Sequence, residues 1–216
     1  MLTWAGKETG DTTLVNIATE HANTTLKNHF RKDYSTYHVV SYDTITGLPD
    51  VKQTHQGYAD ESAWARGQAW ALYGYTMMAR ETGDDAYLQQ AKHIALFLMN
   101  HPRMPEDKVP YWDFDTPDIP NTTRDASAAA IMASALIELS QIDQSSEAAG
   151  YLAYAEDQLR SLSSPEYLAE AGTNCNFVLK HSTGYFKAGS EVDVPLSYAD
   201  YYYVEALMRL KKIIEE

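Results

Sequence analysis

The chain has 216 residues, 44% of them hydrophobic, which is enough for one domain with a sizeable core. Its formal net charge of −13 argues against nucleic acid and anionic membranes as partners. The single cysteine, Cys175, excludes an internal disulfide, and no uncharged apolar stretch reaches the roughly 18 residues of a membrane span.

The tetrapeptide Glu-Thr-Gly-Asp occurs twice, at residues 8–11 and 81–84. An apolar helical pattern precedes each copy, and apolar residues return at helical spacing after it, over residues 14–25 and 88–98. We expect the glycine of each copy to end one helix and the aspartate to cap the next. The repeat therefore predicts buried helices that alternate with amphipathic ones.

The helix expected from about Ser62 to Ala79 begins with the heptapeptide WARGQAW, residues 64–70. The apolar run that follows carries almost no charge, so we expect this helix to be buried nearly all round. Arg66 and Trp70 share one face of the helix. A cation beside an aromatic ring, at the mouth of a buried helix, suits a planar anionic ring such as a uronic acid. The alternative is an arginine that pairs with an internal carboxylate and a tryptophan that only packs.

A third unit follows, with an apolar helix over residues 126–139 and an amphipathic helix over residues 152–162. A last apolar helix is expected from residue 198 to about residue 213. Long loops separate the units, and polar clusters stand where these loops lead into the buried helices: residues 60–66, 112–125 and 191–200. The long loops and widely spaced copies argue against a solenoid of short repeats, whose period is about 34 residues in tetratricopeptide arrays.

This organisation fits an all-α protein of one domain, residues 1–216, built as an α/α toroid. Buried inner helices would alternate with amphipathic outer helices, and a site would lie at one end of the inner ring. The inner helix before the first tetrapeptide has only residues 1–7. A closed ring of six helical hairpins needs more than the roughly seven helices that the sequence predicts, so we expect a toroid that is incomplete at its N-terminus.

Six motifs stand in order along the chain: YSTYHVV (34–40), THQGY (54–58), WARGQAW with YG (64–70, 73–74), PYWDF (110–114), RDASA (124–128), and EVDVPL with YADYY (191–196, 198–202). Together they resemble the unsaturated glucuronyl hydrolases, glycoside hydrolase family 88. The resemblance implies an (α/α)6 toroid of the six-hairpin glycosidase type. It also implies removal of the 4,5-unsaturated uronic acid that polysaccharide lyases leave on oligosaccharides. In that reaction an aspartate protonates C4 of the vinyl ether, water adds at C5, and the hemiketal opens and releases the sugar.

The resemblance also implies roles for single residues. His38 and Gln56 match a histidine and a glutamine that assist catalysis near the water and the ring. Arg66 and Trp70 match a pair that contacts the substrate, and we assign Arg66 to the carboxylate and Trp70 to the ring. Ser62 is a further substrate-binding candidate, with a helix N-cap as its alternative. We expect His38, Gln56, Arg66 and Trp70 to meet in one pocket at the N-terminal end of the inner helices.

Both aspartates that matter in the family match positions before Met1, so we expect the general acid/base to be absent from this sequence and the chain alone to be inactive. We expect no cofactor and no metal, because no cluster of histidine, cysteine or carboxylate has ligand spacing. Asp113, Arg124 and Asp125 are interpreted as a structural ion-pair network.

The expected partner is an unsaturated uronyl oligosaccharide, with no nucleic acid and no membrane. Apolar faces left open by an incomplete ring would bind a missing N-terminal half or drive self-association. We expect a cytoplasmic location, with the periplasm as the alternative. The alternative function is a non-catalytic remnant or a carbohydrate-binding helical domain.

Overall fold

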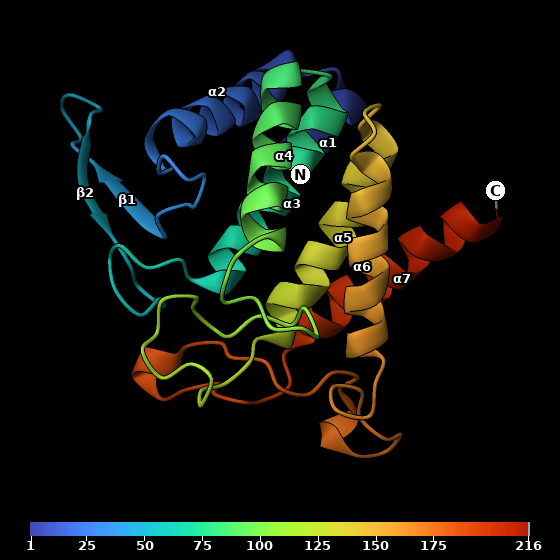
Figure 1. Ribbon diagram of the computed structural model, residues 1–216. Coiled ribbons are helices and arrows are strands. Elements are labelled where there is room, and N and C mark those ends of the chain that lie inside the picture. Colours follow the sequence, from blue (N-terminus) through green and yellow to red (C-terminus); the bar gives the residue numbers. More distant parts are fainter. Residues whose placement is uncertain (216) are drawn as a thin grey trace.

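The computed structural model describes residues 1–215, and α-helices form most of it (Figure 1). Over these residues the α-helices number seven, in agreement with the sequence prediction. In chain order they are α1 (Leu2–Thr9), α2 (Thr12–Asn28), α3 (Ala65–Thr82), α4 (Asp85–Met99), α5 (Ala126–Ile142), α6 (Ala148–Leu162) and α7 (Ser197–Glu215). Long loops, with short 3-10 turns at Asn174–Asn176 and Phe186–Ala188, join the later helices.

The two copies of the tetrapeptide form the same junction between helices. Gly10 ends α1 with a φ of 74°, and Gly83 ends α3 with a φ of 71°. This left-handed conformation favours glycine because a Cβ would be strained there. Asp11 accepts a hydrogen bond from the Thr13 N–H at 2.9 Å, and Asp84 accepts one from the next helix in the same way. The predicted glycine stops and aspartate caps are confirmed.

One element differs from the all-α prediction. Strands β1 (Val39–Tyr42) and β2 (Pro49–Gln53) pair antiparallel, although the sequence predicted only helices and loops. Asp43 closes the turn, because its carboxylate accepts hydrogen bonds from the backbone N–H groups of Ile45 and Thr46 and from the Thr46 hydroxyl. An adjacent pair of β-branched valines favours the first strand. The hairpin brings the residues before β1 beside the residues after β2.

Helix α5 lies at the centre of the helical part and packs against α3, α6 and α7 (Figure 1). Every residue from Ala126 to Leu139 is buried. Alanine and serine dominate this sequence, and their small side chains allow three helices to approach α5 closely. The apolar helix predicted over residues 126–139 is therefore buried on all sides. The burial nearly all round that was predicted for α3 is wrong, because Trp70, Tyr73 and Met77 are only half-buried.

The exposed apolar side chains include groups on α7 and α1. Helix α7 exposes Tyr201, Val204 and Met208 on one face, and α1 exposes Leu2 and Trp4. The helical spacing of the α7 residues makes this a continuous apolar stripe opposite the face that packs on α5. Within residues 1–215, no helix has the length and hydropathy needed to cross a membrane.

Candidate functional site

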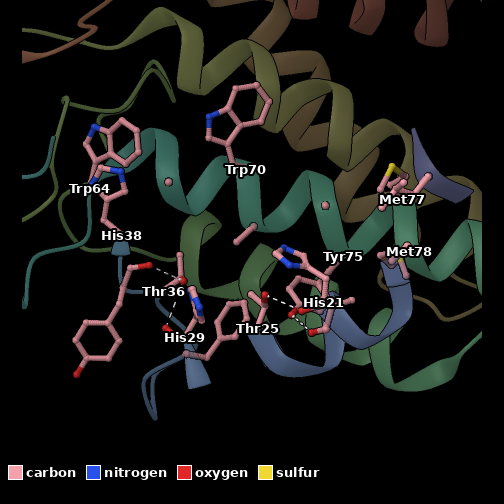
Figure 2. Close-up of a pocket in the computed structure, with 18 of the residues that line it drawn as sticks. His21, Thr25, His29, Thr36, His38, Trp64, Trp70, Tyr75, Met77 and Met78 are labelled. Carbon is pink, nitrogen blue, oxygen red and sulfur yellow. Dashed lines mark hydrogen bonds between the residues drawn. The ribbon is translucent and has the colours of Figure 1, made fainter. Parts of the chain in front are cut away.

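A cavity of about 700 Å³ lies along α3, and α1, α2, the segment from His29 to His38, and Gln56 supply the rest of its wall (Figure 2). The wall is mainly apolar and aromatic. Its polar side chains include His21, His29 and His38. Among the described residues, no aspartate, glutamate, lysine or arginine lines this cavity. The described part of the wall therefore carries no permanently charged side chain.

His38 directly precedes β1 and is held from both sides. Its Nδ1 accepts hydrogen bonds from the backbone N–H groups of His55 and Gln56, both at 3.1 Å. Its ring stacks on Trp64 with centroids 4.3 Å apart (Figure 2). Burial, followed by the nearby His55 and Arg66, lowers the pKa of His38 to about 4.

The protonation of His38 follows from these contacts. At neutral pH the ring is uncharged, and because Nδ1 is an acceptor the single proton is on Nε2. His38 therefore offers a fixed N–H donor. It does not act as a general base at neutral pH.

Gln56 follows β2 in the THQGY segment, so the hairpin brings it beside His38. Its backbone N–H binds His38, and its side-chain Nε2 donates to the carbonyl of Gly184 at 2.8 Å. Within residues 1–215, its Oε1 has no hydrogen-bond partner. Because Gln56 lines the cavity, this oxygen is a hydrogen-bond acceptor for a ligand or a water.

Arg66 is 3% exposed and is not among the residues that line the cavity. Its Nη1 donates to Asp125 Oδ2 at 2.7 Å and to the Thr183 carbonyl at 2.6 Å. Its Nη2 donates to the Gly184 carbonyl at 2.6 Å. The guanidinium also lies 4.7 Å from the centre of the Trp64 ring. These are the contacts of an arginine that pairs with an internal carboxylate, and direct contact with a substrate stays a prediction.

Ser62 is buried, and its hydroxyl binds Asp113 Oδ2 at 2.7 Å. Helix α3 begins at Ala65 with Trp64 at the N-cap position, so the N-cap alternative for Ser62 is wrong. Asp113 is fully buried, and burial raises its pKa while backbone N–H groups hold the carboxylate. Its contacts agree with a structural role, and substrate binding by Ser62 stays a prediction.

Trp70 is half-buried and combines packing with exposure to the cavity. Its ring meets Tyr202 of α7 edge-on, with centroids 5.0 Å apart, and it also lines the cavity wall. His38, Gln56 and Trp70 thus share one cavity near the N-terminal end of α3. Arg66 lies at the same end of the helix, and it contacts the group indirectly, through the Gly184 carbonyl and through the ring of Trp64 that stacks on His38.

Two residues of the site escaped prediction from the sequence. Thr54 accepts the Gly57 N–H at 2.8 Å and lies 3.3 Å from His38 Nδ1, so it closes the turn that presents Gln56. A threonine three residues before a glycine is a recognisable turn signal. Gly184 is 128 residues from Gln56, and no local pattern connects them. No cluster of metal-ligating side chains exists within the described part of the chain.

No protein-family model matches the chain. The chain is 50% identical over 210 residues to the unsaturated glucuronyl hydrolase of Formosa agariphila, a match that covers 97% of this chain and 52% of that protein. The crystal structure of an unsaturated glucuronyl hydrolase specific for heparin superposes with a TM-score of 0.97 at 55% identity, over 100% of this chain and 57% of the other. A Streptococcus agalactiae unsaturated glucuronyl hydrolase mutant complexed with dGlcA-GalNAc6S superposes with a TM-score of 0.85 at 34% identity, over 97% and 55%.

The chain thus spans about half the length of the relatives that it matches. Over that half, the helical toroid of these relatives and the backbone of this chain follow the same path. The order of motifs, the identity and the backbone agree, and the chain belongs to the unsaturated glucuronyl hydrolases, glycoside hydrolase family 88.

Proposed function

We propose that this chain forms part of an active site that removes a 4,5-unsaturated uronic acid from the end of an oligosaccharide. Protonation of C4 and addition of water at C5 convert the vinyl ether into a hemiketal, which opens and releases the shortened sugar. Family membership supports this chemistry, and so do the names of the related proteins. The observation that carries the proposal is the paired arrangement of His38 and Gln56 on the cavity wall.

The two residues offer opposite hydrogen-bonding groups. The Nε2–H of His38 donates to an oxygen of the sugar, and the Oε1 of Gln56 accepts from a hydroxyl or from the attacking water. Trp70 supplies an aromatic surface for the ring. This division of roles suits a hydration reaction, because the water and the sugar oxygens need acceptors and donors at fixed positions.

The acid that protonates C4 comes from outside this chain in our proposal. Among residues 1–215, no carboxylic acid lines the cavity, and the low pKa of His38 leaves little imidazolium at pH 7. In the same way, we assign binding of the substrate carboxylate to neutral hydrogen-bond donors of this chain and to groups supplied by the rest of the helical toroid. A non-catalytic carbohydrate-binding domain is the second candidate, favoured by the same absence of an acid among the lining residues.

A chimera tests the proposal. The matching residues of the Formosa agariphila relative are replaced by this chain, and loss of ultraviolet absorbance of the C4–C5 double bond is followed with an unsaturated uronyl disaccharide. We expect turnover, a loss of about 100-fold or more in His38→Ala, and little change in His93→Ala. His93 stacks on Tyr34 and does not line the cavity, so it is a matched control. A folded chimera that binds the sugar without turnover would support the carbohydrate-binding alternative.

A further inference from the structure

The carbonyl oxygen of Gly184 joins two residues of the site that do not touch each other. It accepts a hydrogen bond from Arg66 Nη2 at 2.6 Å and another from Gln56 Nε2 at 2.8 Å. The first donor belongs to a buried cation and the second to a side chain on the cavity wall. The position of this single oxygen therefore links the guanidinium to the amide of Gln56.

The Gly184 carbonyl is held firmly by its surroundings. Asp125 is fully buried, pairs with Arg66 and accepts the Thr183 N–H at 3.4 Å. Arg66 donates to the carbonyls of both Thr183 and Gly184, which fixes two successive peptide units. The N–H groups of the same two peptide units are also bound: Gly184 donates to the Glu191 carbonyl at 2.6 Å, and Tyr185 donates to the Ser190 carbonyl at 3.1 Å. Both ends of the peptide unit that carries the Gly184 carbonyl are therefore held.

The oxygen and NH2 ends of a side-chain amide have nearly the same shape, so a hydrogen-bonding neighbour must decide which end points which way. An acceptor at Gly184 favours Gln56 with Nε2 toward the loop and Oε1 toward the cavity. The opposite orientation would place two oxygens against each other and turn a donor toward the ligand. The sense of the hydrogen bond that Gln56 offers thus depends on the Gly184 carbonyl.

We propose that Arg66, paired with Asp125, is a positioning residue that fixes the Gly184 carbonyl and thereby orients the Gln56 amide. Its Nη1 is held by the buried ion pair and the Thr183 carbonyl, and its Nη2 donates to the Gly184 carbonyl, so these contacts hold the guanidinium against the loop. Through Gly184 it acts on the cavity without entering it. The proposal deepens the proposed function because Gln56 is one of its site residues, but it concerns the free protein.

The test uses the 15N-labelled chain and measures how fast the Gln56 side-chain N–H protons exchange with water. Gln56→Met identifies the signal. In Arg66→Lys the ammonium keeps the charge beside Asp125 but cannot reach two carbonyls as a planar fork does. We expect roughly tenfold faster exchange of the Gln56 protons. Arg103→Lys is the matched control, since Arg103 also donates to two backbone carbonyls, those of Phe114 and Thr116, away from the cavity.

A second pair of variants tests the link without touching Arg66. A Cβ on Gly184 would lie 2.6 Å from the Cβ of Glu191, so Gly184→Ala must shift this peptide. The Gln56 protons should again exchange faster. The double variant Gly184→Ala/Glu191→Gly should restore slow exchange, because it removes the clash and glycine suits the φ of 54° at position 191.

The outcomes separate the proposal from its rivals. Unchanged Gln56 exchange in a folded Arg66→Lys variant overturns it, and so does unchanged exchange in Gly184→Ala if Arg66→Lys does not fold. No ligand and no turnover enter the measurement, so an inactive chimera would reject the proposed function and leave this result standing. A chimera carrying Arg66→Lys with normal Gln56 exchange but weakened binding of the sugar would instead make Arg66 a direct ligand.

Discussion

Helices α3 and α5 are both apolar central helices, yet only α5 is closed on all sides. Helix α5 is buried throughout from Ala126 to Leu139, whereas α3 turns half-buried Trp70 and Met77 toward the cavity. The difference follows from side-chain size. Small residues let α5 pack against three helices, while the large aromatic and thioether groups of α3 line an open space. Apolar sequence thus predicts burial in a core or in a ligand cavity equally well.

The comparison predicts its largest effect on activity, because no carboxylic acid among residues 1–215 lines the cavity beside α3. We expect the 216-residue chain alone to hydrolyse an unsaturated uronyl disaccharide at least about 100-fold more slowly than the chimera, since general acid–base help is worth about 10²–10⁴ in rate. Ultraviolet absorbance of the double bond measures turnover, and circular dichroism verifies that the chain is folded. Comparable turnover by the monomeric chain would show that a residue of this chain protonates C4.

The two helices should also differ in how much a truncated side chain lowers the stability of the fold. Leu136 of α5 is fully buried, whereas Met77 of α3 is half-buried beside the cavity. We expect Leu136→Ala to lower the free energy of unfolding by about 2–5 kcal/mol, and Met77→Ala by about 1 kcal/mol or less. Urea unfolding of both variants provides the measurement. Equal losses would mean that α3 is packed as tightly as α5 and that the cavity is closed in solution.

The helical scaffold could be predicted from the sequence because its signals are local. Gly10 and Asp11, and the second copy at Gly83 and Asp84, mark helix ends by backbone chemistry that needs no distant partner. The hairpin was missed because its second strand is exposed and lacks the alternation of a half-buried strand. Its valines at 39 and 40 were the available signal.

The site could be predicted only in part. Family motifs pointed to His38 and Gln56, and the structure places both on one cavity. The contacts of Arg66 with Thr183 and Gly184 join residues 117 and 118 positions apart. Nothing local in the sequence distinguishes an arginine that faces a ligand from one that holds a remote loop. That distinction depends on tertiary contacts.

Acid should weaken the cavity side of the fold through His38. Its pKa is about 4 in the folded chain and 6.5 in the unfolded chain, so the unfolded state binds the proton more tightly. The penalty is absent above pH 6.5 and grows as the pH falls toward 4. Over this pH range we expect the free energy of unfolding of the wild type to fall by about 2 kcal/mol more than that of His38→Asn. This is less than the full linkage value because the His38 ring is only half-buried.

Asparagine at position 38 does not titrate and keeps an oxygen that accepts from the His55 and Gln56 N–H groups. His29, whose pKa is also lowered by burial, is present in both proteins, so the difference isolates His38. Urea unfolding at pH 7 and pH 4.5 measures it. Parallel pH profiles for the two proteins would mean that His38 is protonated as easily in the folded chain as in the unfolded one.

The smallest effect concerns the apolar stripe of α7, the face of this helix that lies opposite its contact with α5. Met208 is 62% exposed at the C-terminal end of the stripe, one turn after Val204. We expect the chain to self-associate through exposed apolar surface, and Met208→Lys to weaken this association by roughly tenfold because a charge must be desolvated at the contact.

Gln89→Lys makes the same change of charge on an exposed site of α4 and should have no such effect. Sedimentation velocity over a range of concentrations compares the three proteins. Identical association of Met208→Lys and the wild type would move the contact away from α7, and a monomeric wild type would mean that the exposed stripe is tolerated in water as it stands.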